Sequence, residues 1–140
     1  MIEYDKFQKL LQHLIAQFEN YSSLDASLPA ITQEAVAEST IQRFETCFDS
    51  LWKVLKRYLN EEIGVADLPN GPKPIFRIAN ENRLFRDEQA IERWIDYVNK
   101  RNSTAHDYDG EKAKEALAIM ARFVDDAAAL YETMSGDAWR

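Results

Sequence analysis

Residues that crosslink a chain or break it into turns are scarce in this sequence. It has a single cysteine, Cys47, so a disulfide within the chain is excluded and a metal site built from several thiolates is disfavoured. We interpret Cys47 as a small buried hydrophobic residue. Only four glycines and four prolines occur among 140 residues, which disfavours a turn-rich all-β architecture and favours helices.

Long apolar runs and an excess of basic residues are also missing. No stretch approaches the ~20 consecutive apolar residues of a membrane-spanning helix, and residues 1–11 are amphipathic rather than typical of a signal sequence. We therefore predict a cytoplasmic protein with no membrane association. The net charge of −7 argues against a broad surface for DNA or RNA, because such surfaces cluster lysine and arginine against phosphates. A local basic cleft, or one formed between subunits, is compatible with this charge.

The residues that are present predict one all-α domain over 1–140. A hydrophobic content of 46% with 29% charged residues is ordinary for a globular protein, and this length suits a single core. Apolar residues recur at three- and four-residue spacing, which predicts four principal helices and a short one, at 4–21, 35–63, 75–85, 87–101 and 111–134. With no alternating run in the sequence, we predict an antiparallel bundle of four to five helices.

Two connections interrupt the helical pattern. Residues 22–33 are polar, contain Pro29 and show no sustained period, and residues 64–74 contain three prolines. Gly64 is well placed to end the long second helix, because glycine adopts the left-handed conformation at low cost.

One polar stretch, RNSTAHDYDG at 101–110, contains one of the two histidines of the chain. Arg101 and His106 are five residues apart, so on a continuous helix they would face different sides. For both to act on one group, the helix must end between them or a second subunit must supply one of them. Residues 102–104 suit such an end, because Asn, Ser and Thr side chains compete for backbone hydrogen bonds. Asp107 and Asp109 would favour the protonated form of His106.

An arginine and a histidine in one place have a defined chemistry. Arginine is a permanent, forked cation that suits phosphate oxygens, and histidine transfers protons near neutral pH. Together they are sufficient to cleave RNA without a metal, and we predict no cofactor. The alternative interpretation of Arg101 and His106 is a solvated cap at a helix end, which on spacing alone is the commoner situation.

Other polar and aromatic candidates are weaker. Glu45 and Asp49 lie four apart on the predicted long helix and could form a paired-carboxylate or cation site, but we favour a solvated helix face. His13 is predicted at the surface or at its boundary. Trp52 and Trp94 occur at core spacing, so we expect them to pack in the interior rather than to bind a ligand.

Three segments in order resemble a known family. RNSTAHDY is similar to the Arg-x-x-x-x-His-x-Tyr signature of HEPN-domain proteins, and residues 41–59 and 71–85 are similar to the branch called nucleotidyltransferase substrate-binding proteins. The resemblance is close over about 35–110. It implies a HEPN-type bundle that forms a homodimer, with two signature stretches facing each other across a cleft.

The resemblance also implies a function. Members of the family act with a small nucleotidyltransferase, and in the HepT branch the HEPN protein is a metal-independent ribonuclease toxin that its partner silences by AMPylation. Carried over to this sequence, Arg101 and His106 become the catalytic pair, Asn102 the residue that orients them, and Tyr108 the AMP acceptor. An alternative is a non-catalytic subunit whose Arg101, His106 and Tyr108 bind a nucleotide for the partner enzyme. A third possibility is a purely structural helical dimer.

Overall fold

The described part of the chain is helical throughout. The computed structural model describes residues 1–104 and 110–140, and these residues contain no β-strand. They form six α-helices and one π-helical turn, namely α1 (Asp5–Ser22), α2 (Ala30–Tyr58), η1 (Leu59–Ile63), α3 (Pro72–Glu81), α4 (Ala90–Thr104), α5 (Glu111–Ala118) and α6 (Met120–Ser135). The all-α prediction is confirmed. None of the helices in these ranges combines the length and apolar character that crossing a membrane requires.

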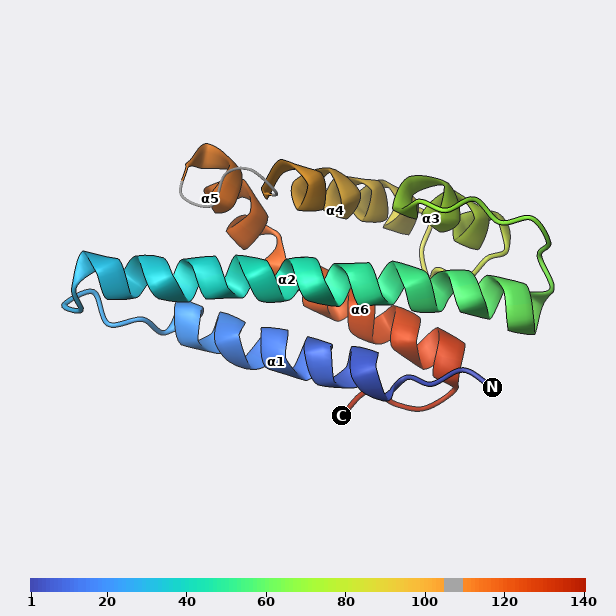
Figure 1. The fold of residues 1–140 in the computed structure, drawn as a ribbon, viewed down its shortest axis with the longest axis horizontal. Helices are drawn as coiled ribbons and strands as arrows, with labels where there is room; N and C mark the ends of the chain where they lie inside the picture. The colour runs from blue at the N-terminus through green and yellow to red at the C-terminus, as the bar shows by residue number, and fades with distance from the viewer. Residues whose placement is uncertain (105–109) are drawn as a thin grey trace.

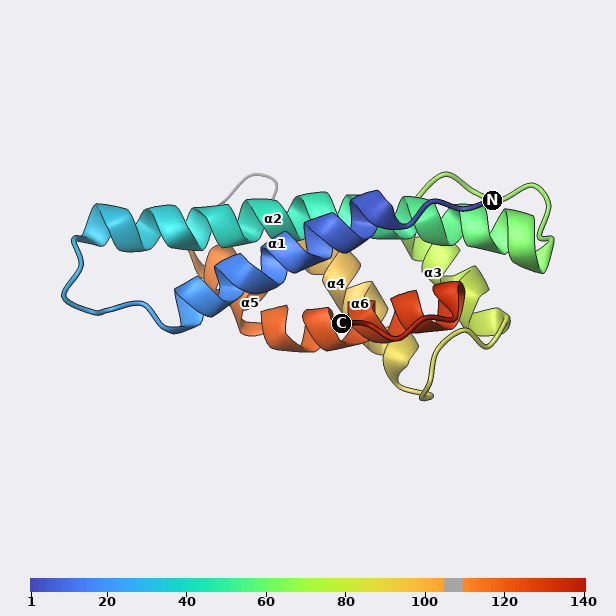
Figure 2. The same cartoon turned by 90° about the horizontal axis from the view of Figure 1, so that it is seen from below.

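Helix α2 is the axis of the bundle. It runs the length of the molecule and contacts each of the other five α-helices. In Figure 1, α1 lies along one side of α2 while α3 and α4 lie along the other, and α1 and α4 run in the opposite direction to α2. Figure 2 shows α6 at a different level from α2, with α1 crossing obliquely from the level of α2 toward that of α6. The antiparallel bundle that the sequence predicted is therefore present.

Aromatic side chains from α2, α4 and α6 fill the interior. Phe123 of α6 lies at the centre, with its ring centroid 4.9 Å from that of Phe44, 5.3 Å from Tyr97, 6.0 Å from Trp94 and 6.3 Å from Phe48. All five side chains are essentially inaccessible to solvent. Trp94 thus packs in the core, as its spacing predicted.

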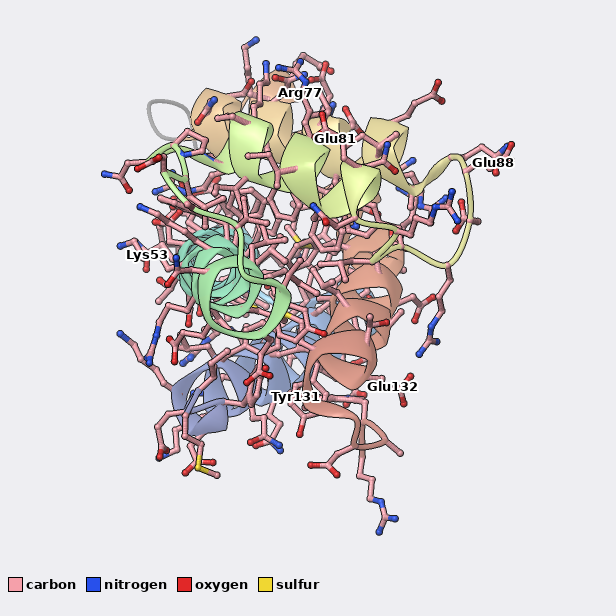
Figure 3. The ribbon with its side chains drawn as sticks, turned by 90° about the vertical axis from the view of Figure 1, so that its right-hand side faces the viewer. Lys53, Arg77, Glu81, Glu88, Tyr131 and Glu132 are labelled. Carbon is pink, nitrogen blue, oxygen red and sulfur yellow. The ribbon has the colours of Figure 1, made fainter. Side chains whose placement is uncertain are left out.

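Charged side chains surround this interior. In Figure 3, Lys53, Arg77 and Glu88 extend away from the apolar centre of the bundle. Cys47 is buried, as expected, whereas His13 is exposed. Burial raises the pKa of the Cys47 thiol above its ordinary value, so this cysteine is unreactive in the folded state.

The start of α2 differs from the prediction. The helix begins at Ala30, directly after Pro29, rather than near residue 35. Its first turns extend past the end of α1 (Figure 1), and Ile31 remains 73% exposed. Because these first turns bury few side chains, their sequence needs no regular spacing of apolar residues. The prediction from periodicity therefore did not include them. Gly64 does end the helical segment, with φ of 84°.

The predicted last helix is two helices. Its continuous apolar pattern contains neither glycine nor proline, yet Ile119 has φ −99° and ψ 1° and separates α5 from α6. The break lets α5 pack against α2 and α4 while α6 packs against α1 and α2. Tertiary packing therefore divides a segment whose local sequence favours one helix.

Candidate functional site

Arg101 projects from the last turns of α4 onto α2 and is held there by two carboxylates. Its Nε and Nη2 donate to the two oxygens of Asp49, at 3.2 and 3.0 Å, so this pair is bidentate. Its Nη1 donates to Oε2 of Glu45 at 3.0 Å. The guanidinium is therefore fixed by a different helix from the one that carries it. We call Arg101, Glu45 and Asp49 the arginine cluster.

Glu45 is the buried member of the cluster. It is only 8% exposed, although it carries a carboxylate. Thr104, which is fully buried on α4, places its hydroxyl oxygen 3.0 Å from Glu45 Oε2 and 3.2 Å from the Arg101 carbonyl oxygen, so the hydroxyl can donate to either. Burying a carboxylate is costly unless a cation and hydrogen bonds compensate for it. Arg101 and Thr104 supply both.

The structure corrects the interpretation of Glu45 and Asp49. Glu45 does not lie on a solvated helix face, and the cation that both carboxylates contact is Arg101 of the same chain. The sequence did contain a signal, because Glu45 follows Phe44 and precedes Phe48 within the apolar period of α2. A carboxylate at such a position requires a partner, but its spacing along the chain does not reveal which one.

The part of α4 that precedes Arg101 is hydrogen-bonded to α6. Arg93 donates from Nε and Nη2 to Asp126 at 2.8 and 2.9 Å, and the Tyr97 hydroxyl donates to the same carboxylate. Hydrogen bonds with Asp126 and Asp87 raise the pKa of Arg93. Burial, followed by the hydrogen bond to Asp126, raises the pKa of Tyr97 above its ordinary value of 10.0. Successive turns of α4 are thus fixed to α6 and then to α2, which positions the end that carries Arg101.

Replacing Tyr97 with phenylalanine is expected to lower the free energy of unfolding by about 1–2 kcal/mol at pH 7, because a hydrogen bond to a charged group is lost. The pKa of Tyr97 is higher in the folded than in the unfolded protein, so its contribution is complete below pH 10 and declines as the pH rises above that value. Urea unfolding at pH 7, 9 and 11 should therefore show wild type and variant converging at high pH. A constant difference at all three pH values would contradict this assignment.

The structure describes Arg101 and Asn102 but not all of the predicted site residues. Arg101 is one-quarter exposed and anchored as described. Asn102 is exposed on the next position of α4, and its orienting role stays a prediction. His106 and Tyr108 lie outside the described residues, so their place relative to Arg101 also stays a prediction. The helix end expected between Arg101 and His106 also stays a prediction, because α4 is described through Thr104.

The arginine cluster is suited to holding a cation in a fixed orientation beside the signature stretch. It combines one positive and two negative groups, so its formal charge is −1. A guanidinium anchored to a neighbouring helix keeps its orientation when charge develops next to it, which is the property that transition-state stabilisation requires. Two carboxylates at the same place also weaken the attraction of the site for a polyanion.

Comparisons with known proteins agree with the resemblance in the sequence. Residues 2–136 match the family model described as nucleotidyltransferase substrate binding protein like. The probable ribonuclease HepT of Haemophilus influenzae is 30% identical over 126 residues, which cover 89% of this chain and 84% of that protein.

Two solved structures have the same fold. A Haemophilus influenzae protein, described as revealing the fold of a substrate binding domain of a nucleotidyltransferase, superimposes with a TM-score of 0.83 at 27% identity, over 95% of this chain and 99% of that one. A crystal structure of a Thermus thermophilus protein gives a TM-score of 0.70 at 26% identity, over 89% and 98% of the two chains. Sequence and fold thus agree over nearly the whole length, and the chain belongs to the nucleotidyltransferase substrate binding protein like family, in its HepT-like branch of the HEPN proteins.

Proposed function

We propose that this chain is the HEPN subunit of a two-component nucleotidyltransferase system, a toxin-antitoxin module in which it acts as a metal-independent endoribonuclease. Arg101 and His106 form the catalytic pair, Asn102 orients them, and Tyr108 accepts AMP from the partner. The observation that carries the proposal is the fixed guanidinium of Arg101, five residues before His106 on a chain related to a probable ribonuclease. Residues 1–140 act as one domain in this proposal.

The chemistry follows from the two side chains. His106 removes the proton of a ribose 2′-hydroxyl or protonates the leaving 5′-oxygen, so that the 2′-oxygen attacks phosphorus and the bond to the 5′-oxygen breaks. Arg101 stabilises the negative charge that builds on the other phosphate oxygens. Neither step requires a metal ion or a cofactor.

A homodimer completes the site in this proposal. Arg101 is tied to α2 of its own chain, so it keeps one orientation while a second copy presents its signature stretch from the opposite side. Residues of the paired helix ends can then converge on one phosphate, and the cleft between the two copies receives RNA. The spacing of Arg101 and His106, which does not suit one continuous helix, is compatible with this arrangement.

AMPylation of Tyr108 accounts for control by the partner. An adenylate two residues from His106 would occupy the cleft and would add negative charge beside a cluster whose formal charge is already −1. Both the bulk of the adenylate and its repulsion of the RNA backbone would oppose binding.

A binding subunit is the second candidate function. The observation that favours it is the engagement of Arg101 by two carboxylates, which leaves the cluster unattractive to long polyanions. In this alternative, Arg101, His106 and Tyr108 hold a nucleotide or another acceptor for the partner enzyme, as the description of the related Haemophilus influenzae structure suggests.

RNA cleavage in EDTA, combined with intact mass, distinguishes the two functions. The protein purified alone should cleave RNA, and incubation with the partner nucleotidyltransferase and ATP should add AMP and abolish cleavage. Tyr108→Phe should prevent both the added mass and the inhibition. His106→Ala should lose activity, whereas His13→Ala, which replaces the other, exposed histidine, should retain it. A lone protein that is inert, and whose His106→Ala variant changes only nucleotide or partner binding, would identify the binding subunit.

A further inference from the structure

We infer that the two carboxylates on Arg101 have opposite roles: Glu45 anchors the guanidinium, and Asp49 occupies the position that a substrate phosphate must take. The inference rests on the proposed function in one respect, namely that Arg101 binds phosphate. It adds a regulatory contact to the site, because the free protein is held in a self-inhibited state by its own carboxylate.

The hydrogen-bond geometry distinguishes the two carboxylates. Asp49 accepts from Nε and Nη2 with both of its oxygens, so it covers a whole two-donor edge of the guanidinium. Phosphate binds arginine through the same parallel pair of N–H groups. Glu45 accepts from Nη1 with one oxygen only. Asp49 therefore imitates a bound phosphate, whereas Glu45 does not.

Burial also indicates that Glu45 is the anchor and that Asp49 is the carboxylate that can be displaced. The Glu45 side chain is 10% exposed and also contacts Thr104, so losing the ion pair with Arg101 would be costly for this buried carboxylate. The Asp49 side chain is 40% exposed, so water can solvate it after it leaves. A phosphate that accepts from the same two donors replaces the bidentate contact that Asp49 gives up. An incoming phosphate can thus displace Asp49 at low cost, while Glu45 and Thr104 keep Arg101 in place.

Charge favours the same exchange. With both carboxylates bound, the cluster has a formal charge of −1; if Asp49 swings away, the remaining Arg101 and Glu45 are neutral as a pair. RNA affinity then depends on how readily Asp49 releases the Nε–Nη2 edge of the Arg101 guanidinium. Removing the charge of Asp49 should strengthen binding, which is the reverse of what a simple structural ion pair would show.

Binding of a fluorescently labelled, 2′-O-methylated RNA, which cannot be cleaved through a 2′-hydroxyl, tests the inference in EDTA. Asp49→Asn should bind about fivefold more tightly than wild type, the equivalent of one partly exposed ion pair. Glu92→Gln is the matched control: it removes one negative charge from an exposed position of α4. It should shift affinity by less than about twofold, because nine residues of helix, roughly 13 Å, separate it from Arg101. Glu45→Gln should weaken binding.

A second measurement separates this inference from the nuclease proposal. The Nε–H resonance of Arg101, identified by its absence in Arg101→Lys, should shift when inorganic phosphate is added, and it should reach half-saturation at a several-fold lower phosphate concentration in Asp49→Asn. That result would support the inference even if the protein never cleaves RNA. The inference would be overturned if Asp49→Asn bound both RNA and phosphate no more tightly than Glu92→Gln does. This outcome does not depend on whether Glu45→Gln folds.

Discussion

Replacing Arg101 with alanine is expected to lower the rate of RNA cleavage by about 10²–10³-fold, the usual effect of removing one charge-stabilising donor. The same change should lower the free energy of unfolding by about 2–3 kcal/mol, because it removes the ion pair between Arg101 and the buried Glu45 carboxylate. The loss is smaller than for a fully buried pair since the Arg101 side chain is 26% exposed. Single-turnover cleavage and urea unfolding measure the two effects separately.

A double variant distinguishes catalysis from stability. In Arg101→Ala/Glu45→Gln the buried group is neutral and Thr104 can still donate to it, so most of the lost stability should return while cleavage stays low. Arg101→Lys keeps the charge but cannot form the bidentate contact with Asp49, so intermediate activity is expected. Recovery of cleavage together with stability in the double variant would show that Arg101 has only a structural role.

Replacing Phe123 with alanine is expected to lower the free energy of unfolding by about 3–5 kcal/mol, the range for removing a large buried aromatic side chain. Its ring contacts those of Phe44, Phe48, Trp94 and Tyr97, and thereby joins α6 to α2 and α4. Because α4 carries Arg101, the cavity should also loosen the arginine cluster. Urea unfolding followed by far-UV circular dichroism gives the loss directly.

Phe18 provides the matched control for this change. It is half-buried on α1 and stacks on Tyr21, with ring centroids 6.4 Å apart. Phe18→Ala removes the same atoms at the edge of the bundle, so its loss should be less than half of that for Phe123→Ala. Equal losses for the two variants would mean that the aromatic centre does not dominate the stability of the fold.

The helices were predictable to the extent that they bury a continuous apolar face. Periodicity located all the principal helices, and Gly64 marked the end of the long helical segment. It failed at the first turns of α2, which bury little, and at Ile119, where the chain changes direction without glycine or proline. The two failures differ in cause. The first turns of α2 bury too little to show an apolar period, whereas the break at Ile119 is decided by packing and leaves no local sequence signal.

The candidate site was predictable through its signature rather than through its contacts. The position of Arg101 near His106 predicts that it binds phosphate, and this role stays a prediction, whereas the family resemblance that this stretch carries is confirmed. Glu45 and Asp49 were noticed but assigned to a solvated face. The roles of His106, Asn102 and Tyr108 stay predictions, as does the single domain over 1–140.

The sequence by itself determined an all-α bundle, the position of its long second helix and the family to which it belongs, because these follow from local periodicity and from residues close together in the chain. Only the tertiary structure decided which groups surround the candidate catalytic arginine. Asp49 and Glu45 are 52 and 56 residues from Arg101 along the chain, and their contact exists because α2 and α4 pack side by side. Periodicity places a residue on a helix face, but the partner across that face depends on how the helices pack.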